Sequence, residues 1–197
     1  MADFPSKKAS RVECTKCTGE VLEKAFESDL AYAQFIAIVP PMRLTRMCGF
    51  EVYENIFEDV YGRRLTSFCK VVPAVKCIPE NTTGNIPVRM FRTCSRMLSN
   101  VYLRRFRCVF LFSRVVQKLV LGGSAPNLKV AAGYPAERNG VIYLLLPSPV
   151  DYDTVAEEVA LGSGDWTAAD RSDLVDIASF FHDSVKRTKK FVGSVDL

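Results

Sequence analysis

The sequence predicts an α+β fold, a mostly helical single domain with a small antiparallel β-component. The chain has 197 residues, 48% hydrophobic and 24% charged, a composition typical of one packed core. Apolar residues recur at helical spacing in most segments, whereas residues 63–79 are richer in β-branched side chains and 128–146 contain a tight-turn dipeptide between two apolar runs. We expect a flexible N-terminal tail over residues 1–12 and a globular domain over residues 13–197.

The first part of the chain is expected to form two helices and an extended segment. Apolar residues recur every three or four positions from about 18 to 37, and Pro40-Pro41 would end that helix. A second stripe over 50–61 precedes Gly62, which suits a left-handed helix stop. Residues 63–79 are rich in β-branched side chains and include Pro73, so we expect a strand at a sheet edge, followed by a loop over 80–87.

The middle of the chain is strongly basic. Residues 89–114, RMFRTCSRMLSNVYLRRFRCVFLFSR, hold seven arginines and no acid. On a helical wheel the bases between 89 and 118 fall within about 60° of one line, with Arg105 as the exception, so we expect a helix, broken near Ser99-Asn100 and ended by Gly122-Gly123. The run CVFLF is also compatible with a buried strand, because a short apolar run cannot be assigned by periodicity alone.

The last third is expected to hold a hairpin and two helices. LKVAAGY and VIYLLL, within 128–146, are joined by PAERNG, whose Asn139-Gly140 favours a tight turn. Ser148-Pro149 is typical of a helix start, and that helix should reach about 161. A final helix opens at Thr167, and its apolar stripe consists of Leu174, Ile177, Ala178, Phe181 and Val185.

Charge is distributed unevenly along the chain. Residues 1–59 contain seven bases and ten acids, residues 60–136 contain thirteen bases and one acid, and residues 137–197 contain six bases and eleven acids. This asymmetry predicts a positive face that attracts phosphate groups or anionic lipid headgroups. The alternative is that acids from the two flanking segments fold back and neutralise it.

The candidate nucleic-acid-binding residues are those of the basic stripe together with a second patch. Arginine suits phosphate because its planar fork donates two hydrogen bonds and also stacks on bases. Tyr102, Phe106 and Phe110 are nearby aromatic residues, although the wheel directs Phe106 and Phe110 toward the core. The candidate residues are Arg89, Arg92, Arg96, Arg104, Arg107, Arg114 and Lys118 in the stripe, and Arg63 and Arg64 in the patch, which Lys70 and Lys76 extend.

Catalytic and metal signatures are weak. Cys14 and Cys17 have the spacing of half a zinc site, but the sequence offers no second pair at matching spacing, so we predict no metal site. His182, the only histidine, would have to serve any cysteine nucleophile. We therefore expect neither an enzyme nor a cofactor.

The sequence thus predicts a non-enzymatic nucleic-acid-binding protein, with RNA favoured, that contacts the backbone through a basic face and possesses the capacity to form a homo-oligomer. Its composition suits a viral-type nucleoprotein, coat protein or RNA-silencing suppressor. One alternative is a self-assembling structural or protein-interaction module, in which acidic ends of one copy meet the basic middle of the next. The other is a basic amphipathic helix lying on an anionic membrane.

Three features favour an intracellular, cytoplasmic protein. The seven cysteines are an odd number, as expected in a reducing compartment. The N-terminal residues lack the apolar core of a secretory signal. The apolar stretch near 101–121 is interrupted by arginines, so we expect no transmembrane helix.

Overall fold

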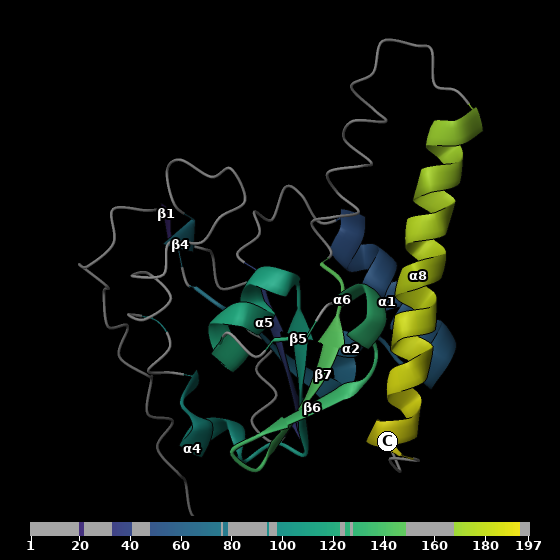
Figure 1. Cartoon of the computed structure of the whole chain (residues 1–197). Helices are drawn as coiled ribbons and strands as arrows, with labels where there is room; N and C mark the ends of the chain where they lie inside the picture. The colour runs from purple at the N-terminus through teal and green to yellow at the C-terminus, as the bar shows by residue number, and fades with distance from the viewer. Residues whose placement is uncertain are drawn as a thin grey trace, which may run out of the picture.

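A computed structural model of the chain describes residues 20–21, 33–40, 48–75, 77–78, 94, 98–122, 125–126, 128–148 and 168–193. Its central feature is a five-stranded sheet with the strand order β3-β2-β5-β7-β6 (Figure 1). The first four of these are mutually parallel, and β6 is antiparallel to β7 at the edge. The strands are β2 (Phe35–Val39), β3 (Cys69–Pro73), β5 (Cys108–Phe112), β6 (Pro135–Arg138) and β7 (Val141–Leu146). Separately, β1 (Glu20–Val21) pairs with β4 (Cys77–Ile78) in antiparallel fashion.

Helices cover both faces of the sheet. The long α8 (Ala168–Val192) packs beside α1 (Cys48–Tyr61) on one side, whereas α4 (Asn100–Leu103) and α5 (Arg114–Leu121) lie on the other (Figure 1). The short helix α2 (Leu65–Phe68) connects α1 to β3. The short helix α6 (Leu128–Ala131) leads into the β6–β7 hairpin. The arrangement is three layers, helix on sheet on helix.

The two central strands, β2 and β5, are buried along their whole length. Alternate side chains supply the two layers of the core. Phe35 and Phe110 face α1 and α8, and they pack with Phe57 and Phe181. The intervening side chains of these strands, Ile36, Ile38, Val109 and Leu111, face α5. Strands that are buried on both faces read as continuous apolar runs, as FIAIV and CVFLF do.

The expectation that helices and strands combine in one fold is confirmed in its coarse form. The expectation of a mostly helical domain with a small antiparallel β-component is not confirmed, because the five-stranded sheet is mostly parallel. The helix expected over the basic stretch, broken near Ser99-Asn100 and ended by Gly122-Gly123, is wrong at 108–112, where CVFLF forms β5 and the buried-strand alternative is correct. Burial of both faces of CVFLF between two helical layers decides the assignment there.

Features with strong local signals are confirmed. Helix α1 ends before Gly62, which has φ +73°, and α5 ends before Gly122, which has φ +71°. Strand β3 lies at the edge of the sheet, and Asn139-Gly140 forms the turn of the β6–β7 hairpin. The apolar stripe of the last helix faces the core through Phe181 and Val185.

Two further predictions are wrong, and three cannot be compared. Residues 35–37 are strand, so the helix expected over 18–37 does not extend to its predicted end. Leu128–Ala131 is a helix, so the first strand of the hairpin is PAER and not LKVAAGY. The loop over 80–87 and the helix expected after Ser148 lie outside the described residues, as does the tail over 1–12.

Gly133 fixes how closely the hairpin approaches α8. Its φ is +81°, and its backbone N–H donates to the Leu145 carbonyl at 2.6 Å. A Cβ atom at this position would collide with the backbone oxygen of Ser184 and lie 2.7 Å from the Cβ of Arg187. Only glycine satisfies both the left-handed backbone and this contact.

We predict that Gly133→Ala lowers the free energy of unfolding by roughly 2–5 kcal/mol, the sum of left-handed backbone strain and overpacking. Gly62→Ala is the matched control, since its φ is similar and nothing lies within 4 Å of the added methyl. It should cost only about 1–2 kcal/mol. Urea denaturation measures both variants, and equal losses would contradict the close packing of Gly133 on α8.

We also predict that Phe110→Ala costs about 3–5 kcal/mol of unfolding free energy, because it leaves a cavity between β5 and α1. The ring of Phe110 is fully buried and packs edge-on against Phe57 at 5.6 Å between centroids. Val101→Ala, at a side chain that is 78% exposed, should change stability by less than about 0.5 kcal/mol. Thermal or urea melts compare the two, and a small loss for Phe110→Ala would argue against β5 as a central strand.

Candidate nucleic-acid interface

The structure does not bring the predicted basic residues onto one helix face. Arg104 and Arg107 precede β5, whereas Arg114 and Lys118 follow it on α5. Strand β5 spans roughly 13 Å, so the two pairs start at opposite ends of the sheet. Arg107 lies with its guanidinium near Gly193, at the end of α8.

The second patch lies elsewhere. Arg63 and Arg64 are exposed in the link between α1 and α2, and Arg64 Nε lies 3.8 Å from the carboxylate of Glu54. The buried Glu54 carboxylate also accepts from the backbone N–H of Thr66 at 3.2 Å, and burial raises its pKa. Three stripe residues, Arg89, Arg92 and Arg96, lie outside the described residues, as do Lys76, Cys14 and Cys17.

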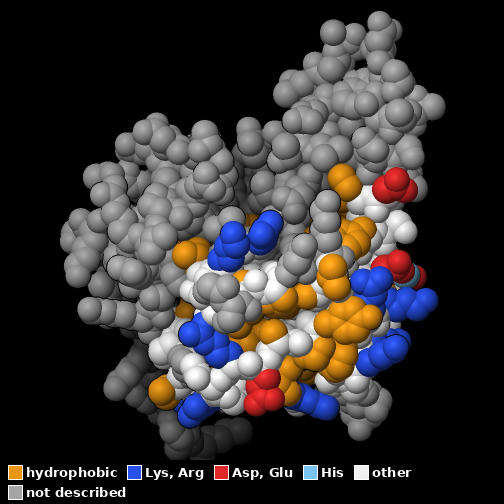
Figure 2. Space-filling model, in the orientation of Figure 1, with side chains coloured by type: hydrophobic (Ala, Val, Ile, Leu, Met, Phe, Trp, Pro, Cys, Tyr) orange, Lys and Arg blue, Asp and Glu red, His pale blue; other side chains and the backbone are white. Residues whose placement is uncertain are grey.

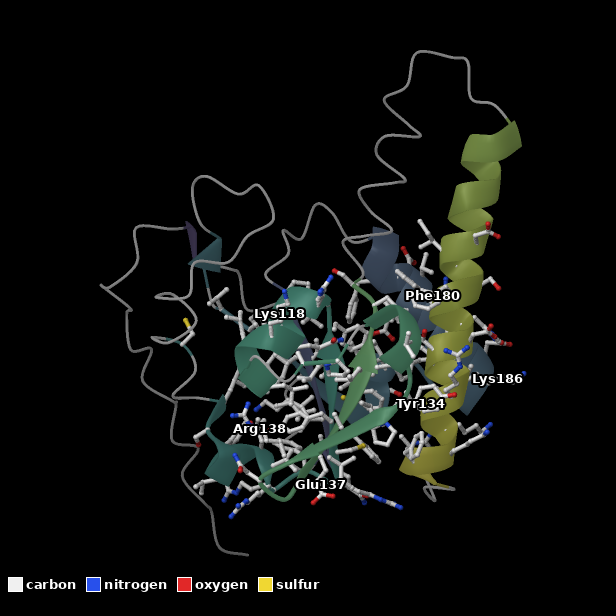
Figure 3. All side chains as sticks on the ribbon, in the orientation of Figure 1. Lys118, Tyr134, Glu137, Arg138, Phe180 and Lys186 are labelled. Carbon is white, nitrogen blue, oxygen red and sulfur yellow. The ribbon has the colours of Figure 1, made fainter. Side chains whose placement is uncertain are left out.

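Three exposed cations do share one side of the molecule, and we call them the basic band: Arg104, Lys118 and Arg138. Arg104 Nε donates to the carbonyl oxygen of Asn139 at 2.8 Å, across to the hairpin turn. Arg138, the last residue of β6, donates from Nη1 to the carbonyl oxygen of Val120 at 3.4 Å. Val120 lies on α5, two residues beyond Lys118. The hairpin therefore connects the loop before β5 to α5, and Figure 3 shows Lys118 and Arg138 on the same side.

Among the described residues, the acids other than Glu137 belong to elements distant from the basic band. Residues 98–122 contain no acid. Among the acidic side chains that the structure describes, those on helices belong to α1 or α8, and Glu137 lies on β6. Within the described part of the chain, the three band residues form no ion pair. The acids of α1 and α8 lie across the sheet, so they do not neutralise the band.

An exposed aromatic ring lies on the same hairpin. Tyr134 immediately precedes β6 and is 49% exposed, and the Arg187 guanidinium lies 5.8 Å from its ring centroid. Figure 2 shows apolar side chains on this face with Lys and Arg around them, and Figure 3 places Tyr134 between Arg138 and Lys186. An aromatic ring that is half exposed can stack on an unpaired base.

The aromatic residues suggested by the sequence are placed differently. Phe110 is fully buried in the core, as the wheel indicated. Tyr102 and Phe106 are half-buried and pack edge-on against each other, with 5.3 Å between ring centroids. Their rings are therefore partly occupied by each other.

Sequence reasoning missed Arg138 because it lies in the acid-rich segment 137–197, and it missed Tyr134 because that residue lies in the predicted hairpin, outside the basic stripe. A usable signal was present in the hairpin prediction. The Asn139-Gly140 turn fixes Arg138 as the last residue before the turn, and period-two alternation then separates it from Glu137 on the opposite face. Their relation to α5 depends on long-range packing, which local patterns do not contain.

Two of the described cysteines are buried, and the histidine contacts a neighbouring helix. Cys69 and Cys108 are buried, and burial raises the pKa of both thiols, that of Cys108 to about 12. His182 Nε2 lies 2.8 Å from Asp59 Oδ2, a contact that joins α8 to α1. Across the described residues, no group of three His, Cys, Asp or Glu side chains is placed to hold a metal ion.

We predict that Cys69 and Cys108 resist iodoacetamide at pH 8 in the folded protein, because a thiol with a raised pKa stays protonated and these two are also inaccessible. Cys94, which is half-buried, should react sooner. Mass spectrometry of peptides after timed labelling measures each site. Rapid modification of Cys108 without unfolding would contradict its burial beside Phe35.

Comparisons with known proteins add no assignment. No protein-family model matches the chain, and no curated protein sequence matches it. Among the described helices, none combines the length and the apolar character needed to cross a bilayer. The functional argument therefore depends on the geometry of the basic band and its neighbours.

Proposed function

We propose that this protein binds nucleic acid through the basic band, without catalysis, and that it contacts the phosphate backbone in preference to base edges. The observation that supports this most directly is that Arg104, Lys118 and Arg138 come from three separate segments and lie on one side of the sheet, where few of the described residues are acidic. Such a surface attracts a polyanion along its length. We include in this proposal, as an extension of the surface, three arginines that lie outside the described residues: Arg89, Arg92 and Arg96.

The two arginines of the basic band are oriented before any ligand binds. Each donates one hydrogen bond to a backbone carbonyl, and its remaining N–H groups stay available. Arg138 also lies beside the C-terminal end of α5, where a cation is favourable. Fixed guanidiniums lose less rotamer entropy on binding than free ones do, so phosphate contacts formed here gain affinity.

Single strands fit this surface better than a rigid duplex. Tyr134 offers an exposed ring for an unpaired base, and the Arg187 guanidinium beside that ring adds a positive charge that attracts phosphate. Unpaired bases are common in RNA loops and ends, which is the reason RNA is favoured over duplex DNA.

Self-assembly is the second candidate function. The basic band lies on one side of the sheet, and the acidic side chains of α1 and α8 lie on the other. This arrangement permits head-to-tail contacts between copies. Size-exclusion mass that falls with added salt, in nucleic-acid-free protein, would favour this candidate. The membrane alternative requires a basic amphipathic helix, and the described part of the basic stretch is interrupted by the buried strand β5.

We predict that Arg104→Glu/Arg138→Glu weakens binding of single-stranded RNA and lowers the slope of log Kd against log salt by about 1.4, the loss of two phosphate contacts. Lys186→Glu/Lys190→Glu, on exposed positions of α8, changes the net charge equally and should leave the slope near that of wild type. Fluorescence anisotropy over a salt series measures all three proteins, after circular dichroism has verified their folding. Equal effects of the two variants would reduce the proposal to non-specific attraction, and no wild-type binding at low salt would refute it.

The same titration separates stacking from charge. Tyr134→Ala should weaken RNA binding by about 1–3 kcal/mol at every salt concentration and leave the slope unchanged. Tyr134→Phe keeps the ring and should bind as wild type does. If both Tyr134 variants match wild type, the aromatic contribution is absent and the band acts alone.

A further inference from the structure

A second feature of interest lies at the carboxyl ends of the central strands, where α5 begins one helical turn before Lys118 of the basic band. The chain leaves β2 toward α1 on one face of the sheet and leaves β5 toward α5 on the other. In open parallel sheets, this divergence creates a crevice outside the carboxyl ends of the two strands, and ligands bind there. The first turn of α5 starts at this edge.

The first turn of α5 is shaped by Ser113. This residue has φ +80° and caps the eight-residue helix, its side-chain oxygen accepting from the backbone N–H of Val116 at 3.2 Å. Its own N–H donates to the carbonyl oxygen of Leu146 at 3.0 Å. The backbone N–H of Arg114 has no acceptor among the described residues, and the Arg114 side chain is exposed. A helix start with a free N–H and a guanidinium attracts an anion.

Gln117 supplies an independent sign of a missing ligand. Its side chain is fully buried, and Nε2 donates to the carbonyl oxygens of Leu111 at 3.3 Å and Leu146 at 3.2 Å. The Leu146 carbonyl is the one that also accepts from Ser113, so the amide lies beneath the first turn of α5. Its Oε1 atom is buried and has no hydrogen-bond donor.

Exchanging the two amide atoms of Gln117 does not remove this deficit. The exchanged oxygen would face the carbonyl oxygens of Leu111 and Leu146, two acceptors that offer it no hydrogen. A buried acceptor without a donor is unfavourable, and a donor brought by a ligand would satisfy it.

We propose that the first turn of α5 binds a phosphate monoester that also carries a hydroxyl or amine group. The phosphate accepts from the backbone N–H and the guanidinium of Arg114, and the donor group satisfies Gln117 Oε1. This inference does not rest on the proposed nucleic-acid function, because neither Arg114 nor Gln117 belongs to the basic band. The ester is either a free small molecule or the phosphorylated end of a nucleic-acid strand.

Isothermal titration calorimetry with ribose 5-phosphate, inorganic phosphate and ribose tests the site. We expect ribose 5-phosphate to bind, inorganic phosphate to bind more weakly, and ribose not to bind. Arg114→Glu should weaken ribose 5-phosphate binding at least tenfold, whereas Arg105→Glu, exposed before β5, should leave it unchanged. Gln117→Met should weaken ribose 5-phosphate about tenfold and leave inorganic phosphate unaffected.

A comparison of 5′-phosphorylated and 5′-hydroxyl oligonucleotides identifies the source of the phosphate. A preference for the phosphorylated end that disappears in Arg114→Glu supports a strand end, and binding of ribose 5-phosphate alone supports a free ester. Arg104→Glu/Arg138→Glu should retain ribose 5-phosphate binding, so failure of the basic band and failure of this site are distinguishable. The proposal is overturned if neither ribose 5-phosphate nor the 5′-phosphorylated oligonucleotide binds. It is also overturned if Arg105→Glu and Arg114→Glu lose the same affinity for ribose 5-phosphate. Because the Arg114 side chain is exposed, its substitution tests the site independently of folding.

Discussion

The pairing of β2 with β5 is the constraint on which the rest of the structure depends. Both strands are buried on both faces, so each layer of helices must supply apolar side chains to them. Aromatic side chains dominate the layer toward α1 and α8, where Tyr53 packs against Phe112 and Phe181. Aliphatic side chains dominate the layer toward α5. The polar features discussed above therefore lie at the two ends of the strands or on the outer surfaces of the helices.

Local chemistry was sufficient to predict the boundaries of several elements and insufficient to predict their pairing. Glycines with positive φ at positions 62 and 122 end helices because the stop depends on a single residue, and Asn139-Gly140 forms a turn for the same reason. CVFLF fits a helix or a strand equally well in isolation. Its neighbours Phe35 and Tyr143 are far away in sequence, and only their presence selects the strand. The order and parallel pairing of the strands therefore could not be predicted from the periodicity of apolar residues.

The candidate interface was predictable in part. The charge count identified a basic middle segment with a single acid, and Arg104 and Lys118 of that segment belong to the basic band. The helical wheel gave the wrong geometry, because a strand and a turn separate these residues along the chain. Arg138 completes the band from an acid-rich segment, so no count by segment could include it. Gln117 was missed because a glutamine in an amphipathic helix carries no distinguishing pattern.

The position of α8 affects how the chain can fold during translation. Helix α1 covers part of one face of the sheet, and α8 completes that face beside β7 with Phe181, Val185 and Val192. A ribosome adds about 5–20 residues per second, so β7 waits roughly 2–10 seconds for this cover. The apolar surface that α8 buries therefore stays exposed on the nascent chain after all five strands have been synthesised.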